Sequence, residues 1–270
     1  MAGIAERDRQ QAVLRLLDEA GKVGVGELMD RFGVSAVTIR KDLEALERRR
    51  LLRRVRGGAV ALVGADEGAF DMRLRHATAQ KQAIARKAAT FVQDGDAIAL
   101  DCSTTCYYLA LEIRSRRGLV VVTNGLRAAD VLSESDAVTV VLPGGTVRRS
   151  SQSIVGDFGD VFSSRARLNS GFFGLRSLAP ADGLMELSSE ETAVKRRLAA
   201  ACTDIYGLFD SSKVGRFALH PFVTSDRIAG LVSDEGLGDD TVGQWAECGV
   251  PVHRVAPDQP SARLSRVEAG

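Results

Sequence analysis

The sequence predicts an α/β protein in two parts, an N-terminal winged helix-turn-helix domain and a larger domain built on a mostly parallel sheet. Three observations lead to this prediction. Residues 10–62 read as three short helices and a hairpin, in a region of basic net charge. Residues 97–232 alternate short apolar runs with helical patterns. Polar residues follow directly after several of those runs, where ligands bind in open α/β sheets.

The helix-turn-helix prediction rests on two helices separated by a glycine. Residues 10–20 carry an apolar stripe and predict a first helix, and residues 25–32 predict a short second one. Gly33 allows a sharp turn, and Ser35 is a good N-cap for a third helix. The apolar positions of that helix are four and three residues apart: Ile39, Leu43 and Leu46. In such a pair the later helix enters the DNA major groove.

A basic hairpin is expected after the third helix. Residues 51–55 predict a strand, Gly57 and Gly58 a turn, and residues 59–62 a returning strand. Residues 1–60 hold 13 Lys and Arg against 9 Asp and Glu, a net of +4, whereas the whole chain holds 36 against 35. Basic charge therefore gathers where a phosphate backbone would be met. The alternatives are an arginine-rich solvated face, or a winged helix that serves protein–protein assembly.

This region resembles the DNA-binding signature of the DeoR family of bacterial transcription regulators. The matching positions are Leu28 and residues 32–35, 38–43 and 56–59. The resemblance implies a regulator of a kind that usually represses sugar-catabolic operons. The residues expected at double-stranded operator DNA are Ser35, Thr38, Arg40, Lys41 and Arg56. Arg50 stands where the family usually carries Gly before the wing, so either the turn differs or Arg50 adds a phosphate contact.

Composition and sequence patterns argue against membrane-spanning, secreted and zinc-binding proteins. The 270 residues are 45% apolar and 26% charged, as in a soluble globular protein with one small and one ordinary domain. No apolar run reaches 18 residues and the N-terminus lacks a secretion signal, so a cytoplasmic protein without membrane contact is expected. The 4 cysteines form no CxxC pair and there are only 3 histidines, so a zinc site is not expected. No cofactor is predicted.

The expected domains are residues 1–62 for DNA binding, 63–72 as a linker and 73–255 as the α/β domain, with a disordered tail over 256–270. Strands are predicted over residues 97–100, 119–122, 138–142, 170–173, 205–209 and 227–232. Helices are predicted over residues 107–113, 126–132 and 190–202, and around residues 84–91. This alternation favours a mostly parallel sheet that is covered on both faces.

Polar residues gather where these strands end. Residues 101–105 lie between a strand and a helix N-terminus, where backbone N–H groups and the helix dipole suit an anion such as phosphate. The alternative is that Thr104 or Thr105 merely caps the helix. Asp210 and Lys213 follow a later strand and offer an acceptor and a positive charge, although a lysine in such a place is commonly only solvated.

Two further pairs have a local alternative to ligand binding. Gly144 and Gly145 would let a ligand approach the backbone, or they form only a turn. Glu191 and Lys195 are spaced as a helix pair and need not contact a ligand.

Taken in order, these residues resemble the sensor domain of the same family, so the likeness spans about residues 8–240. It implies a fold similar to those of ribose-5-phosphate isomerase and CoA transferases, with a phosphorylated sugar as effector. The effector residues so implied are Asp101, Ser103, Thr104, Thr105, Thr123, Asn124, Gly144, Gly145, Gly174, Glu191, Lys195, Asp210 and Lys213. Ser103 replaces the usual Gly of the loop, and Ser170 replaces an Asp that usually begins a later strand.

The leading functional prediction is a homo-oligomeric regulator, a dimer or tetramer, that binds operator DNA, has no catalytic residues and is released by a phosphorylated sugar. The alternative is a sugar-phosphate isomerase-like enzyme with an appended DNA-binding domain. Such an enzyme needs a carboxylate base, and Asp101, Glu191 and Asp210 are its candidates.

Overall fold

The computed structural model describes residues 6–20, 22–48, 52–60, 70–156 and 167–257. The chain forms two compact units, Met1–Ala69 and Phe70–Gly270, called here the winged-helix unit and the sheet unit. Arg50 lies outside the described residues, as do residues 63–69 of the expected linker and 258–270 of the expected tail. None of the helices in the described ranges is long and apolar enough to cross a membrane.

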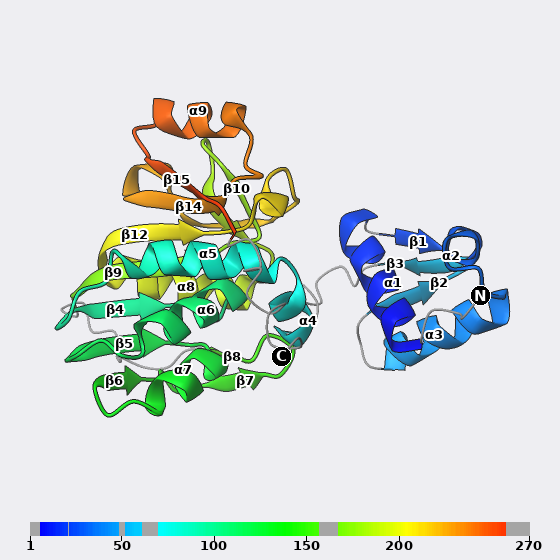
Figure 1. Cartoon of the computed structure of the whole chain (residues 1–270), viewed down its shortest axis with the longest axis horizontal. Helices are drawn as coiled ribbons and strands as arrows, with labels where there is room; N and C mark the ends of the chain where they lie inside the picture. Colours follow the sequence, from blue (N-terminus) through cyan, green and yellow to red (C-terminus); the bar gives the residue numbers. More distant parts are fainter. Residues whose placement is uncertain (1–5, 21, 49–51, 61–69, 157–166, 258–270) are drawn as a thin grey trace, which may run out of the picture. The chain divides into compact units, whose positions relative to one another are not determined.

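The winged-helix unit has the predicted architecture (Figure 1). Its elements are α1 (Glu6–Ala20), β1 (Lys22–Gly24), α2 (Val25–Phe32), α3 (Ala36–Arg48), β2 (Arg53–Val55) and β3 (Gly58–Val60). The strands form an antiparallel sheet in the order β1-β3-β2. Strand β1 was not predicted, because three residues between two helices carry too little periodicity to be recognised.

Local chemistry explains how α2 gives way to α3. Gly33 adopts a left-handed φ of 64° and its N–H bonds to Met29 O, which ends α2. The Ser35 Oγ accepts a hydrogen bond of 3.2 Å from the Thr38 N–H, so Ser35 caps α3 as predicted. The apolar face of α3 is buried as predicted, with exposed fractions of 1% or less at Ile39, Leu43 and Leu46.

The sheet unit alternates helices and strands in the predicted manner. Its first elements are α4 (Phe70–Arg75), α5 (Thr78–Ala89), β4 (Ala97–Leu100), α6 (Thr104–Ile113), β5 (Leu119–Thr123), α7 (Leu126–Ser133) and β6 (Val138–Val141). Then come β7 (Thr146–Arg148), β8 (Ser153–Val155), β9 (Leu168–Gly174), β10 (Ser177–Ala179), β11 (Gly183–Glu186) and α8 (Ser189–Ala201). The last are β12 (Cys202–Leu208), β13 (His220–Val223), β14 (Gly230–Asp234), α9 (Asp239–Glu247) and β15 (Val252–Val255), with short 3₁₀ turns η2 (Ser211–Lys213) and η3 (Ser225–Arg227).

Seven parallel strands form the central sheet in the order β15-β14-β12-β9-β4-β5-β6. Along the chain, β5 and β6 are added in turn on one side of β4, and β9 is then added on the other side. The junction of β4 and β9 is therefore a topological switch point, where open α/β sheets leave a crevice at the carboxyl ends of their strands. In register, Ile98 lies beside Ser170 and Leu100 beside Phe172.

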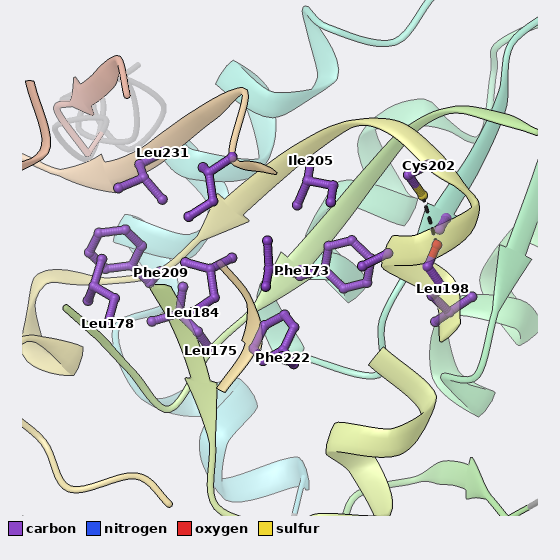
Figure 2. Close-up of a cluster of buried hydrophobic side chains, with 14 of the residues drawn as sticks. Phe173, Leu175, Leu178, Leu184, Leu198, Cys202, Ile205, Phe209, Phe222 and Leu231 are labelled. Carbon is purple, nitrogen blue, oxygen red and sulfur yellow. Dashed lines mark hydrogen bonds between the residues drawn. The ribbon is translucent and has the colours of Figure 1, made fainter. Parts of the chain in front are cut away.

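The sheet is buried on both faces, which explains its continuous apolar strands. Ile98, Leu100 and Phe172 pack with residues of α5, α6 and α7 on one face. Ala99 and Phe173, one residue along, point to the opposite face and pack with α8. Figure 2 shows this second cluster, in which Phe173 and its neighbours from several strands gather beside α8.

Several boundaries differ from the sequence predictions. Helix α4 begins at Phe70, so residues 70–72 belong to the sheet unit and not to the linker. Helix α6 begins at Thr104, three residues before its predicted start, because Ser103 caps the helix and the polar Thr104 and Thr105 form its first turn. The strand predicted from Arg227 begins only at Gly230, since residues 225–227 form the 3₁₀ turn η3.

Two small antiparallel sheets were missed. Strands β10, β11 and β13 form one, and β7 pairs with β8 in the other. Their strands have three or four residues each and lie between elements of the main sheet, so no alternation distinguishes them from loops.

Candidate functional site

The face of α3 away from the core carries the polar residues predicted to meet DNA. Ser35, Arg40 and Lys41 are exposed, and Arg56 is exposed at the turn between β2 and β3. Thr38 differs from the prediction: it is half-buried, and its hydroxyl lies 3.0 Å from the Ser35 Oγ in the capping turn. The exposed cations therefore lie on both the helix and the wing, as binding to a phosphate backbone requires.

A hydrogen bond joins the third helix to the wing. The backbone N–H of Arg54 donates to the Glu47 carboxylate at 2.8 Å. This bond joins β2, the first strand of the wing, to the last turn of α3.

A buried ion pair fastens α1 to α3 beneath that surface. The Arg9 Nε donates to the Asp42 Oδ2 at 2.5 Å and its Nη2 to the Oδ1 at 3.1 Å. The Gln10 side-chain amide adds a third bond to the same carboxylate at 3.3 Å. Both charged side chains are at most 9% exposed. Asp42 therefore orients the third helix on the first, and Arg9 and Gln10 are partners that the sequence did not suggest.

The second site lies at the switch point between β4 and β9. Asp101 directly follows β4, is fully buried, and accepts the backbone N–H of Ser103 at 2.9 Å. Gly174 ends β9 beside it: a Cβ at Gly174 would lie only 2.3 Å from the Ser103 Cβ. Glycine is therefore required at 174 to let the two strand ends meet.

Lys195 of α8 reaches into this junction and is the centre of an ion-pair network. Its Nζ lies 3.1 Å from the Asp101 Oδ2 and 2.5 Å from the Glu186 Oε2, and it donates to the Gly174 carbonyl at 3.0 Å. Burial lowers the pKa of Lys195, but the charges of Asp101 and Glu186 outweigh it and hold the pKa well above the ordinary lysine value. The side chain therefore stays charged at neutral pH.

Glu191, one turn before Lys195, pairs elsewhere. It lies 3.1 Å from the Arg148 Nη1 and accepts from the Ser153 hydroxyl at 3.2 Å. The two residues thus are more than a local helix pair, because each joins α8 to a different strand. The set Asp101, Arg148, Glu186, Glu191 and Lys195 is called here the switch-point cluster.

Residues at the end of β5 and just after it lie beside the Asp101 loop. The Thr123 hydroxyl accepts the Gly125 N–H at 3.0 Å, and a Cβ at Gly125 would come within 2.9 Å of the Cys102 Cα. The Asn124 amide donates to the Ile154 carbonyl at 3.2 Å. Its Oδ1 is buried and has no hydrogen-bond partner among the described residues. A buried acceptor without a partner is costly, which makes this atom a candidate contact for a ligand hydroxyl.

The N-terminus of α6 directly follows the Asp101 loop. The Ser103 Oγ accepts the Cys106 N–H at 3.2 Å, so Ser103 is the cap, where Thr104 or Thr105 was the predicted alternative. The first bond of the helical ladder runs from the Tyr107 N–H to the Ser103 carbonyl. The N–H groups of Thr104 and Thr105 precede that bond and point out of the helix end, as in anion sites at helix N-termini.

Asp210 and Lys213 follow β12 at the same edge of the sheet. Asp210 is buried and accepts both the backbone N–H and the hydroxyl of Ser212. Burial raises its pKa, but the charge of Lys213 and the Ser212 bond outweigh burial and hold the pKa below the ordinary aspartate value. Lys81 and His76 add positive potential at the same carboxylate.

The structure brings together most of the predicted effector residues, but not all. Gly144 and Gly145 lie exposed in the loop between β6 and β7, whereas the residues of the switch-point cluster are mostly buried. Ser170 lies within β9, about 13 Å before the carboxyl end of that strand at Gly174. The serine that replaces the usual Asp is therefore distant from the switch-point cluster. Glu186 and Arg148 were missed, because the short strands that carry them were not recognised.

Comparison with known proteins supports both units. Residues 9–63 match the model of the DeoR-like helix-turn-helix domain, and residues 76–235 match that of the DeoR C-terminal sensor domain. The HTH-type transcriptional regulator GolR of Listeria innocua is 32% identical over 246 residues, which are 91% of this chain and 97% of that protein. The glycerol-3-phosphate regulon repressor of Escherichia coli is 29% identical over 214 residues, 79% of this chain and 85% of that protein.

A solved structure of ribose 5-phosphate isomerase A from Neisseria gonorrhoeae aligns with a TM-score of 0.38 and 15% identity, over 50% of this chain and 52% of that one. The family models together match most of the chain, and the regulator from Listeria matches nearly all of it. The resemblance seen in the sequence is thereby confirmed: the chain belongs to the DeoR family of helix-turn-helix transcription regulators.

Proposed function

We propose that the protein represses a sugar-catabolic operon and leaves its operator when a phosphorylated sugar binds the loops around the switch-point cluster. The observation that carries this proposal is the composition of that edge of the sheet. It combines the N-terminus of α6 at Thr104 and Thr105, a lysine at 213 and a buried acceptor at Asn124. The first two suit a phosphate and the third suits a sugar hydroxyl. A relative named for the glycerol-3-phosphate regulon agrees with a phosphorylated polyol or sugar as effector.

In this proposal the network around Lys195 has a structural role. Its charge is already shared between Asp101 and Glu186, which holds α8 against β4. Lys213 is half-buried at the edge and is the cation that the proposal assigns to the phosphate. A phosphate brings about −1.5 to −2 charges at neutral pH, so that single lysine should matter strongly.

Lys213→Met is expected to leave operator affinity near wild type and to make the DNA complex insensitive to effector. Losing one charge-assisted hydrogen bond costs about 1.5–3 kcal/mol, so half-release should need at least about tenfold more effector. Thr105→Ala should act in the same direction more weakly, because the helix N-terminus stays in place. The measurement is release of preformed protein–DNA complex by a panel of sugar phosphates, beside the exposed control Arg114→Met.

Equal release from wild type and Lys213→Met would show that Lys213 is only a surface lysine. Failure of every sugar phosphate to release the wild type would reject the proposed effector class. Release of the operator by an effector also requires that the effector bind the DNA-free conformation of the protein more tightly than the DNA-bound one.

Arg40→Ala is expected to weaken operator binding without unfolding the winged-helix unit, because Arg40 is exposed on α3. If Arg40 reads a base, the loss should be about 1–3 kcal/mol and confined to one operator position. If it binds phosphate, the loss should be uniform across sequences, with a salt slope smaller by about one unit. Arg48→Ala, at the far end of α3, is the matched control. Unchanged affinity of Arg40→Ala would remove Arg40 from the interface.

We further propose that the protein is not an enzyme. The three carboxylates of the switch-point cluster are each paired with Lys195 or Arg148. A general base must reach the proton it removes, and a carboxylate held by a buried cation is poorly placed for that. Turnover of pentose phosphates by the pure protein would contradict this and favour the isomerase-like alternative.

A homo-oligomer, dimer or tetramer, is proposed as the DNA-binding form, acting in the cytoplasm. One winged helix offers a small interface, and symmetric dimers usually read two half-sites. The sheet unit exposes Phe217 by 72% and Leu219 by 58%, in the segment that follows Lys213, which supports association through that unit. A monomer in sedimentation at micromolar concentration that still binds its operator specifically would contradict the oligomer.

A further inference from the structure

Val37 is an exposed apolar residue on the surface that the winged-helix unit presents to DNA. It is the second residue of α3 and is 60% exposed. Arg40 and Lys41 follow it at three and four positions, so the three side chains share one face of the helix. Ile39, Leu43 and Leu46 are buried on the other side. The core therefore does not explain an apolar residue at position 37.

The neighbours of Val37 point to one kind of partner. A surface patch with two exposed cations, beside a wing with exposed Arg53, Arg54 and Arg56, complements a polyanion. Residues near the N-terminus of a recognition helix are those that contact base edges in the major groove. The apolar group that the major groove presents is the 5-methyl group of thymine.

We propose that Val37 packs against the 5-methyl group of a thymine in each half-site of the operator. This inference rests on the DNA-binding function and adds a sequence requirement to it: one thymine per half-site is recognised through its methyl group. Arg40 and Lys41 flank the contact and supply polar readout or phosphate binding on either side. The basic wing contributes affinity that does not depend on that thymine.

The test uses the full-length protein and a duplex selected by it from a random-sequence library. Each thymine of that duplex is replaced in turn by deoxyuridine, which lacks only the methyl group. One position per half-site should lose about fourfold in affinity, the value of one buried methyl-sized group. With Val37→Ala, which removes both γ-methyl groups, the same replacement should have a clearly smaller effect, whereas the effects of deoxyuridine elsewhere should be unchanged.

Two variants make the result specific. Val37→Thr retains a methyl group and should retain the dependence on the thymine methyl. Val55→Ala removes a 42% exposed apolar side chain from β2 of the wing and should leave the dependence intact. Val37→Ala should fold normally, because the residue is exposed and alanine is the better helix former.

Three outcomes would overturn the proposal. If Val37→Ala lost affinity but every deoxyuridine replacement kept its effect, Val37 would not contact the thymine methyl group. If Val37→Ala reduced the effect of no deoxyuridine replacement, α3 would not recognise a thymine methyl group through residue 37. A changed oligomeric state of Val37→Ala, with unaltered readout of DNA, would make it a contact between copies. Failure of the library to yield any preferred duplex would instead contradict the DNA-binding function itself.

Discussion

Asp42→Ala is expected to unfold the winged-helix unit and abolish operator binding, while the sheet unit keeps its fold. The substitution leaves the Arg9 guanidinium buried without the carboxylate that binds it twice, and Gln10 loses the same acceptor. Breaking a buried ion pair in this way costs about 3–5 kcal/mol. Whole domains are stable by only about 5–15 kcal/mol, and a unit this small lies near the lower end. The DNA-reading surface should therefore be lost.

The measurement combines operator binding with urea unfolding of the full-length chain, in which the two units should unfold separately. Asp30→Ala removes an exposed aspartate from α2 and serves as the matched control. A double variant, Arg9→Met with Asp42→Leu, removes both buried charges and should recover much of the stability. Wild-type stability of Asp42→Ala would show that the pair does not hold α1 to α3.

Lys195→Met is expected to destabilise the sheet unit by about 3–5 kcal/mol, because two buried carboxylates, Asp101 and Glu186, lose the cation between them. Since Asp101 also positions the Ser103 loop, effector response should fail even where the unit still folds.

The control is Arg114→Met, which removes an exposed cation just after α6. A rescue variant adds Asp101→Asn and Glu186→Gln to Lys195→Met, which removes the buried charges while keeping their shapes. Urea unfolding of all three measures the effect. An unfolding free energy of Lys195→Met equal to that of Arg114→Met would show that the network contributes nothing to stability.

The sequence predicted those parts of the fold that have strong periodicity. Helix α3 was predicted from its cap at Ser35 and its buried face, and β4 from the apolar run at residues 97–100. Strands such as β7 and β11 were not, because three or four residues give no pattern that differs from a loop. Arg148 and Glu186 were missed for the same reason, so only three of the five residues of the switch-point cluster could be named from the sequence.

Pairings were harder to predict than positions. Glu191 and Lys195 invite a local pairing at i,i+4 spacing, but each binds a residue from a distant strand. The burial of α8 against the sheet decides this, because a buried charge must be satisfied by whatever the neighbouring strands provide. The position of Thr38 was likewise hard to predict from the sequence, because its contact with Ser35 in the capping turn depends on the backbone there.

The pairing of β4 with β9 also affects the order in which the chain can fold during its synthesis. Asp101 and Gly174 are neighbours in space, although the chain makes β5 to β8 between them. Domains generally fold in the order of their synthesis, so the N-terminal unit can form while β9 is still untranslated. The Ser103 loop then lacks the strand end against which it packs. A nascent chain can therefore complete the winged-helix unit before it completes the junction between β4 and β9.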